Sequence, residues 1–160
     1  MDDKIVIGVD GSPASRTALR WAVEEAKLRG CAVDAVLAWH VDYGMVIGSL
    51  STAVATGMSR EKVEESYRSL LAEVVAETGE EVTAVLAEGD PREVLVKASG
   101  NAALLVVGSR GAGPFREVLL GSVSSYCVHH AHCPVVVIRT PKAHAEPVEP
   151  KPVVTPGPLL

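Results

Sequence analysis

The stretch Lys4-Ile5-Val6-Ile7-Gly8-Val9 runs directly into Asp10-Gly11-Ser12-Pro13, and this junction decides how the chain folds. The first six residues form a short, mostly β-branched run of the kind found in buried strands. In the next four, Asp10 and Gly11 form a turn, Ser12 is a suitable helix N-cap, and Pro13 is favoured at the first helical position. Apolar residues then recur at helical spacing as far as Gly30, where we expect the helix to end. The junction therefore predicts a strand that leads straight into a helix.

The same order of strand and helix repeats along the chain. The expected strands are 4–9, 32–39, 82–87, 103–107 and 135–138, and helices are expected at 13–30, from Ser59, at 90–100 and at 121–130. This alternation is typical of βαβ units around a parallel sheet. Hydrophobic residues make up 48% of the chain but aromatic residues only 4%, which favours a core of small aliphatic side chains in a buried parallel sheet. The fold class is therefore α/β, with a surface loop or flap between His40 and Ser59.

Composition limits the domain count and the partners. A length of 160 residues suits one domain, which we expect over 1–140, and the six prolines beyond Thr140 predict a disordered tail over 141–160. The net charge of −5, without any run of Lys and Arg, argues against nucleic acid as a partner. No segment has the roughly 20 apolar residues needed to cross a bilayer, and the first residues do not resemble a secretory signal. We therefore expect a cytoplasmic protein whose three cysteines are reduced thiols.

Candidate binding residues follow the expected strands, because ligands of open parallel sheets bind at the carboxyl ends of the strands. Asp10 follows the first strand, Ala38 to His40 end the second, and a glycine-rich stretch from Gly108 to Ser122 follows the fourth. Glycines let backbone N–H groups approach a phosphate, and a helix N-terminus adds unpaired donors and a favourable dipole. Two arginines and two hydroxyls near this stretch suit phosphate oxygens, namely Arg110, Arg116, Ser122 and Ser124. The alternatives are that the glycines only form a tight surface loop and that Asp10 only caps a turn.

Two other groups of residues invite a functional interpretation. Zinc binding is one reading of the cluster Cys127, His129, His130, His132 and Cys133. We do not favour it, because the helical spacing turns these side chains in different directions and four ligands do not converge tetrahedrally. Trp39, beside a candidate site segment, is a possible platform for stacking a base, whereas Trp21 is expected to pack within its helix layer.

The spacing of the glycine-rich stretch is specific. Gly108, Gly111, Gly121 and Ser122 follow the pattern glycine, two residues, glycine, nine residues, glycine, serine, which resembles the ATP-binding members of the universal stress protein family. The resemblance extends over residues 3–139. It includes Val9-Asp10-Gly11-Ser12, Gly89-Asp90-Pro91 and Cys133-Pro134-Val135.

This resemblance implies an open, Rossmann-like sheet of five parallel strands in the order 3-2-1-4-5, with helices on both faces and homodimers formed through the last strand by Val135 and Val137. Asp10 would face the ribose or phosphates, the backbone near Ala38 would contact the adenine, and the glycine-rich stretch would surround the ribose and phosphates. The nucleotide-binding residues that it implies are Asp10, Gly11, Ala38, Trp39, Gly89, Gly108, Ser109, Arg110, Gly111, Gly113, Gly121, Ser122, Val123 and Ser124. The expected ligand is ATP, with ADP or AMP as alternatives, and Mg²⁺ would bridge the phosphates and Asp10.

The functional expectation is a nucleotide-dependent regulator in stress response or signalling, not an enzyme. No Walker lysine follows the glycine-rich stretch, no G-x-G-x-x-G follows the first strand, and no nucleophile with a neighbouring base is evident. One alternative is a slow Mg²⁺-dependent ATP hydrolase in which Asp10 holds the metal and Arg110 or Arg116 stabilises transferred charge. Another is a protein whose ligand is cyclic AMP.

Overall fold

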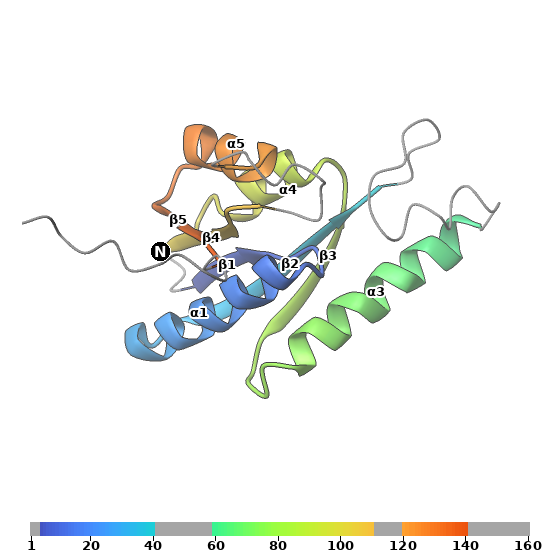
Figure 1. Cartoon of the computed structure of the whole chain (residues 1–160), viewed down its shortest axis with the longest axis horizontal. Helices are drawn as coiled ribbons and strands as arrows, with labels where there is room; N and C mark the ends of the chain where they lie inside the picture. The colour runs from blue at the N-terminus through green and yellow to red at the C-terminus, as the bar shows by residue number, and fades with distance from the viewer. Residues whose placement is uncertain (1–3, 41–58, 111–119, 141–160) are drawn as a thin grey trace, which may run out of the picture.

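The computed structural model describes residues 4–40, 59–110 and 120–140, and these form one parallel sheet covered by helices (Figure 1). The strands are β1 (Lys4–Gly8), β2 (Ala32–Trp39), β3 (Thr83–Glu88), β4 (Leu104–Gly108) and β5 (Val135–Ile138). The helices are α1 (Pro13–Arg29), α3 (Arg60–Ala76), α4 (Pro91–Ala98) and α5 (Ser122–His130). The strand order is β3-β2-β1-β4-β5 with every pairing parallel, which confirms the expected sheet.

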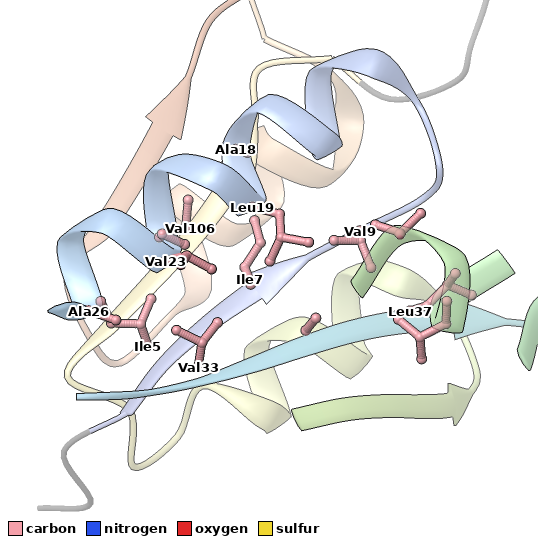
Figure 2. Packing of buried hydrophobic residues seen from close by; sticks show 14 of the residues in the cluster. Ile5, Ile7, Val9, Ala18, Leu19, Val23, Ala26, Val33, Leu37 and Val106 are labelled. Atoms are coloured by element: carbon pink, nitrogen blue, oxygen red, sulfur yellow. The ribbon is translucent and has the colours of Figure 1, made fainter. Parts of the chain in front are cut away.

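Helices cover both faces of the sheet, and the strand residues alternate between them. In β1, Ile5 and Ile7 point into the layer under α1 and α3, whereas Val6 points into the layer under α4 and α5. Figure 2 shows the first of these layers, in which Leu19 of α1 packs near Ile7. All three strand side chains are completely buried, as expected for a central parallel strand. The core is mostly aliphatic, as the composition predicted.

The helix boundaries follow local chemistry that the sequence already displayed. The hydroxyl of Ser12 accepts a hydrogen bond from the N–H of Ser15, and this N-cap starts α1 immediately before Pro13. Gly30 ends the helix with φ at 69°, a left-handed conformation that glycine adopts without strain. The side chains of Ser59 and Asp90 cap α3 and α4 in the same way.

Two strands begin and end one residue later than the sequence predicted. β3 extends to Glu88, because Glu88 pairs with Trp39 of β2, and β4 extends to Gly108, because Gly108 pairs with Ile138 of β5. Pairing with a neighbouring strand, which a local pattern does not reveal, sets these ends. Trp21 lies partly buried against the core, which confirms its expected packing role.

Parts of the expected organisation fall outside the described residues. The segment 41–58, which we interpreted as a loop or flap, and the tail 141–160 are among them. Within the described ranges, no helix is both long and apolar enough to cross a bilayer.

Candidate functional site

The turn after β1 is organised by its own polar groups. The carboxylate of Asp10 accepts a hydrogen bond from the N–H of Ser12 at 2.9 Å, which is an Asx turn. The hydroxyl of Ser15 is buried. It accepts a hydrogen bond from the N–H of Asp10 at 3.3 Å and donates one to the carbonyl of Ser12 at 3.0 Å. Gly11 has φ at 79°, a conformation that residues with a Cβ rarely adopt. The Asp10 carboxylate is therefore held at the carboxyl edge of the sheet by a preformed turn.

The end of β4 lies against the first turn of α1. A Cβ added to Gly108 would come within 3.5 Å of the backbone and Cβ of Ala14, and within 3.3 Å of the carbonyl oxygen of Arg110. Since β1 and β4 are paired neighbours, this close approach places the start of the glycine-rich stretch beside the Asp10 turn. Two segments separated by about a hundred residues in the sequence thus share one edge of the sheet.

The two ends of the glycine-rich stretch meet at Ser109. The N–H of Gly121 donates to the carbonyl of Ser109 at 2.7 Å, and the hydroxyl of Ser124 lies 3.2 Å from the same oxygen and 3.0 Å from the carbonyl of Gly121. The N–H of Ser109 donates to Ile138 at the end of β5. Ser109 and Ser124 are 4% and 2% exposed, so their hydrogen bonds fix the start of α5 relative to the sheet.

The first turn of α5 has the features of an anion site. Its N-cap is Gly121, which has no side chain to bond the first N–H groups of the helix. Ser122 is exposed at the first helical position, and Val123 follows half-buried. Unpaired N–H groups and the positive end of the helix dipole favour a negative charge at such an end. The sequence suggested that the hydroxyls of both Ser122 and Ser124 contact phosphate. In the structure the Ser122 residue is exposed, whereas Ser124 is buried and its hydroxyl contacts the carbonyls of Ser109 and Gly121.

At the ends of β2 and β3 the backbone forms hydrogen bonds between the strands, and the ring of Trp39 is buried. The carbonyl of Trp39 accepts a hydrogen bond from Gly89 at 2.9 Å, and Ala38 pairs with β3. The indole of Trp39 is only 4% exposed, because the ring of Tyr67 lies 6.2 Å away and the guanidinium of Arg60 lies 5.6 Å above it. The ring therefore belongs to the core under α3, and a contribution from this segment to a ligand would come from its backbone.

An ion pair lies next to these strand ends, at the start of α4. Arg92 forms hydrogen bonds to both carboxylate oxygens of Asp90, and its guanidinium lies 5.7 Å from the ring of Tyr126. The pairing with Arg92 lowers the pKa of Asp90 below its ordinary value, and the nearby His40 acts in the same direction. No local pattern in the sequence indicates this role of Arg92, because only the packing of α4 against α5 brings it close to Tyr126.

The side chains of the zinc interpretation lie in and just after α5, and Arg110 follows β4. Among residues 4–40, 59–110 and 120–140, no three His, Cys, Asp or Glu side chains are grouped as metal ligands. His129 and His130 each place Nδ1 within hydrogen-bond distance of a carbonyl one turn earlier, and Cys127 is buried in the core. Arg110 is half-buried at the end of β4. The expected site residues Gly111 and Gly113, and the nearby Arg116, lie outside the described part of the chain.

These features define an α/β protein of the Rossmann-like class with a polar site at the carboxyl ends of its strands. The family model of the universal stress protein family matches residues 1–139, and the chain belongs to this family. A universal stress protein of Mycobacterium tuberculosis strain H37Rv is 31% identical over 163 aligned residues, which cover 92% of this chain and 49% of the relative. The chain thus spans about half the length of the curated relatives that it matches.

Solved structures with the same fold support the assignment of the architecture. Universal stress protein UspA from Lactobacillus plantarum superposes with a TM-score of 0.64 at 23% identity, covering 86% of this chain and 98% of that chain. The universal stress protein from Archaeoglobus fulgidus in complex with dAMP has a TM-score of 0.61 at 23% identity, with coverages of 86% and 98%. A family protein from Arabidopsis thaliana with AMP bound gives 0.57 at 21% identity, with coverages of 88% and 93%.

Proposed function

We propose that this chain binds an adenine nucleotide, with ATP as the principal ligand, at the carboxyl edge of its sheet. The observation that carries the proposal is the hydrogen bond between Gly121 and Ser109, which brings the start of α5 to the end of β4. This contact directs a helix N-terminus without a side-chain cap toward the edge that also holds Asp10. Such an arrangement supplies donors for phosphates and an acceptor for ribose hydroxyls.

Each part of the site takes a distinct role in this proposal. The N–H groups of Ser122 and Val123 and the hydroxyl of Ser122 bind phosphate oxygens. Gly108 starts the stretch that would surround the ribose and phosphates, and a Cβ there would lie 3.3 Å from the carbonyl oxygen of Arg110. Asp10 would accept hydrogen bonds from the ribose or, where Mg²⁺ accompanies the phosphates, would hold the metal together with them. The remaining proposed contacts are backbone or supporting ones, from Gly11, Ala38, Trp39, Gly89, Ser109, Arg110, Gly111, Gly113 and Ser124.

Adenine nucleotides are favoured over other phosphate ligands by the family relationship. Proteins of the same fold are described as complexes with dAMP and with AMP. A triphosphate is proposed because the spacing of Gly108, Gly111, Gly121 and Ser122 resembles that of the ATP-binding members of the family.

We further propose that nucleotide binding regulates the protein and that turnover is slow or absent. The sequence supports this proposal, because no Walker lysine follows the glycine-rich stretch and no nucleophile with a neighbouring base is evident. Occupancy would instead change the exposed surface or the assembly of the protein. We also propose a cytoplasmic location, because ATP is available there.

A homodimer through β5 completes the proposal. This strand is an edge of the sheet and pairs only with β4 among the described strands. The carbonyls of Pro134 and Ile138 accept hydrogen bonds from Leu105 of β4 and from Ser109 just beyond it. The backbone groups of Val135 and Val137 therefore point away from β4. An exposed edge of this kind is a natural template for pairing with a second chain.

The proposal is tested by denaturing extraction of freshly purified protein, with mass spectrometry of the released small molecules. Calorimetric titrations with ATP, ADP and cyclic AMP accompany it. Recovery of an adenine nucleotide, or ATP binding in the micromolar range, is expected. No recovered nucleotide together with no measurable affinity would refute nucleotide binding. If the protein binds cyclic AMP more tightly than ATP, cyclic AMP is the ligand. If it hydrolyses many ATP molecules per second and Asp10→Ala abolishes this activity, the hydrolase alternative is favoured.

A further inference from the structure

Arg16 connects the Asp10 turn to helix α3. It lies in α1, and its Nε donates to the carbonyl of Gly11 at 3.2 Å. The two terminal nitrogens of the same guanidinium pair with α3 and its C-cap, Nη2 with Glu73 at 3.1 Å and Nη1 with Glu77. The side chain of Arg16 is 22% exposed, which shields it partly from solvent. One planar group thus joins α1, the Gly11 carbonyl of the turn and α3 with its C-cap.

A second contact between α3 and the turn is independent of these charges. A Cβ added to Gly11 would lie 3.0 Å from a methyl group of Leu70, so the α3 side chain packs directly on the turn. Gly11 also requires its left-handed conformation, with φ at 79°. The turn is therefore held by Arg16 at its carbonyl and by Leu70 over its Cα.

We propose that Arg16 is a positioning residue of the nucleotide site, which orients the Asp10–Gly11 turn for the ligand and couples that turn to α3 through Glu73 and Glu77. The inference rests on the proposed function and names a residue that the glycine pattern does not contain. Arginine suits this role, because its rigid fork of donors engages one carbonyl and two carboxylates at the same time. A lysine at position 16 would concentrate its donors on one nitrogen and would not reproduce this geometry.

The coupling runs in both directions. If the ligand orders the turn around Asp10, the contacts with Arg16 and Leu70 stabilise the adjoining face of α3 in the bound state. Displacement of α3 would in turn loosen the Gly11 peptide and weaken binding. The site would then be linked to an outer helix that does not itself touch the phosphates in the proposed binding mode.

The test compares Arg16→Gln and the double variant Glu73→Gln/Glu77→Gln with two matched controls. Arg20→Gln makes the same change of charge one turn further along α1, where the Nε of Arg20 lies 3.5 Å from the carbonyl of Arg16. Lys27→Gln breaks a different ion pair of α1, with Glu80, which does not involve the turn. The controls thus separate loss of charge and loss of a surface ion pair from loss of the Gly11 contact.

Two measurements are made on each full-length variant. Calorimetry gives the ATP affinity, and hydrogen exchange without ligand reports the amides of residues 11, 12 and 15. Arg16→Gln is expected to weaken ATP binding about tenfold and to speed exchange in the turn, with a smaller effect in the double variant and less than about twofold in both controls. Thermal unfolding verifies that every variant is folded at the temperature of titration.

The outcomes separate this inference from the proposed function. If unaltered protein binds ATP and Arg16→Gln binds it equally well, the inference is overturned and the proposed function stands. An equal loss in Arg20→Gln also overturns it, because long-range charge would then explain the effect. If unaltered protein binds no adenine nucleotide, the proposed function fails, and with it the ligand-orienting role of Arg16.

Discussion

The backbone N–H of Gly121 donates to the carbonyl of Ser109 at 2.7 Å, although eleven residues lie between them in the sequence. The same carbonyl lies 3.2 Å from the buried hydroxyl of Ser124, which adds a second donor. Strand β4 and helix α5 are therefore joined at the point where the glycine-rich stretch leaves the sheet and returns. This junction forms the base of the candidate site.

Gly121→Val is expected to abolish ATP binding while the fold is retained. The backbone of Gly121 has φ at −70° and ψ at 169°, which any residue adopts, so valine causes no backbone strain. Its side chain would instead occupy the space in front of the α5 N-terminus. Calorimetry should show at least about a hundredfold loss of affinity, with little change in the thermal midpoint. Gly100→Val, at the other end of the sheet, is the control, and equal affinity in both variants would refute the placement of the site.

Asp10→Asn is expected to separate the structural role of this residue from its role toward a ligand. Asparagine keeps an oxygen that accepts from Ser12, so the free energy of unfolding should change by less than about 0.5 kcal/mol. Loss of the negative charge should weaken Mg²⁺-dependent ATP binding about tenfold. Asp10→Ala removes the turn contact as well and should lower stability by about 1 kcal/mol. Full affinity in both variants would remove Asp10 from the site.

The ion pair between Asp90 and Arg92 predicts a loss of stability in acid. Since Arg92 lowers the pKa of Asp90 in the folded state, this group stabilises the fold above its unfolded pKa of about 3.9. The contribution is lost as pH falls below that value through the lower folded pKa. Asp90→Asn keeps an N-cap without the charge, so it should be less stable than unaltered protein near neutral pH. Urea unfolding at several pH values gives the free energy of unfolding of both proteins. The difference between unaltered protein and Asp90→Asn should shrink in acid, and a difference that does not change with pH would contradict the stabilising ion pair.

Cys127 is expected to be the slowest of the three cysteines to react with iodoacetamide. Its side chain is completely buried, and this burial raises the pKa of its thiol to about 11. Because the thiolate is the reactive form, about one molecule in a thousand carries it near pH 8. Cys31 and Cys133 are partly exposed. Mass spectrometry of native protein should show alkylation at these two first, and rapid labelling of Cys127 without denaturant would contradict the buried position of α5.

Val137→Pro is expected to disrupt the proposed dimer without unfolding the protomer. The N–H that proline removes points away from β4, so the hydrogen bonds within the sheet remain. Val136→Pro is the matched variant, because it removes a donor that faces β4 and should destabilise the protomer itself. Light scattering should report a dimer for unaltered protein and a monomer for Val137→Pro. A monomeric unaltered protein, or a dimeric Val137→Pro, would refute pairing through this edge.

The order and type of the elements could be predicted from the sequence because the signals are local. Ser12 and Gly30 bound α1, and strand 32–39 was predicted at the residues where β2 is found. The ends of β3 and β4 shifted by one residue, since each is set by pairing with a neighbouring strand. The strand order came from the family resemblance, because periodicity alone does not specify which strands are adjacent.

For the candidate site, the sequence by itself identified the residue types and their spacing. Asp10, Gly108, Gly121 and Ser122 were recognisable because turns, glycine freedom and helix N-termini depend on neighbouring residues in the chain. Only the tertiary structure decided that the buried hydroxyl of Ser124 contacts Ser109, that the ring of Trp39 is covered, and that Arg16 reaches Gly11 and α3. These are contacts between segments far apart in sequence. Their geometry depends on how helices pack on the sheet, and no local pattern of residues encodes that packing.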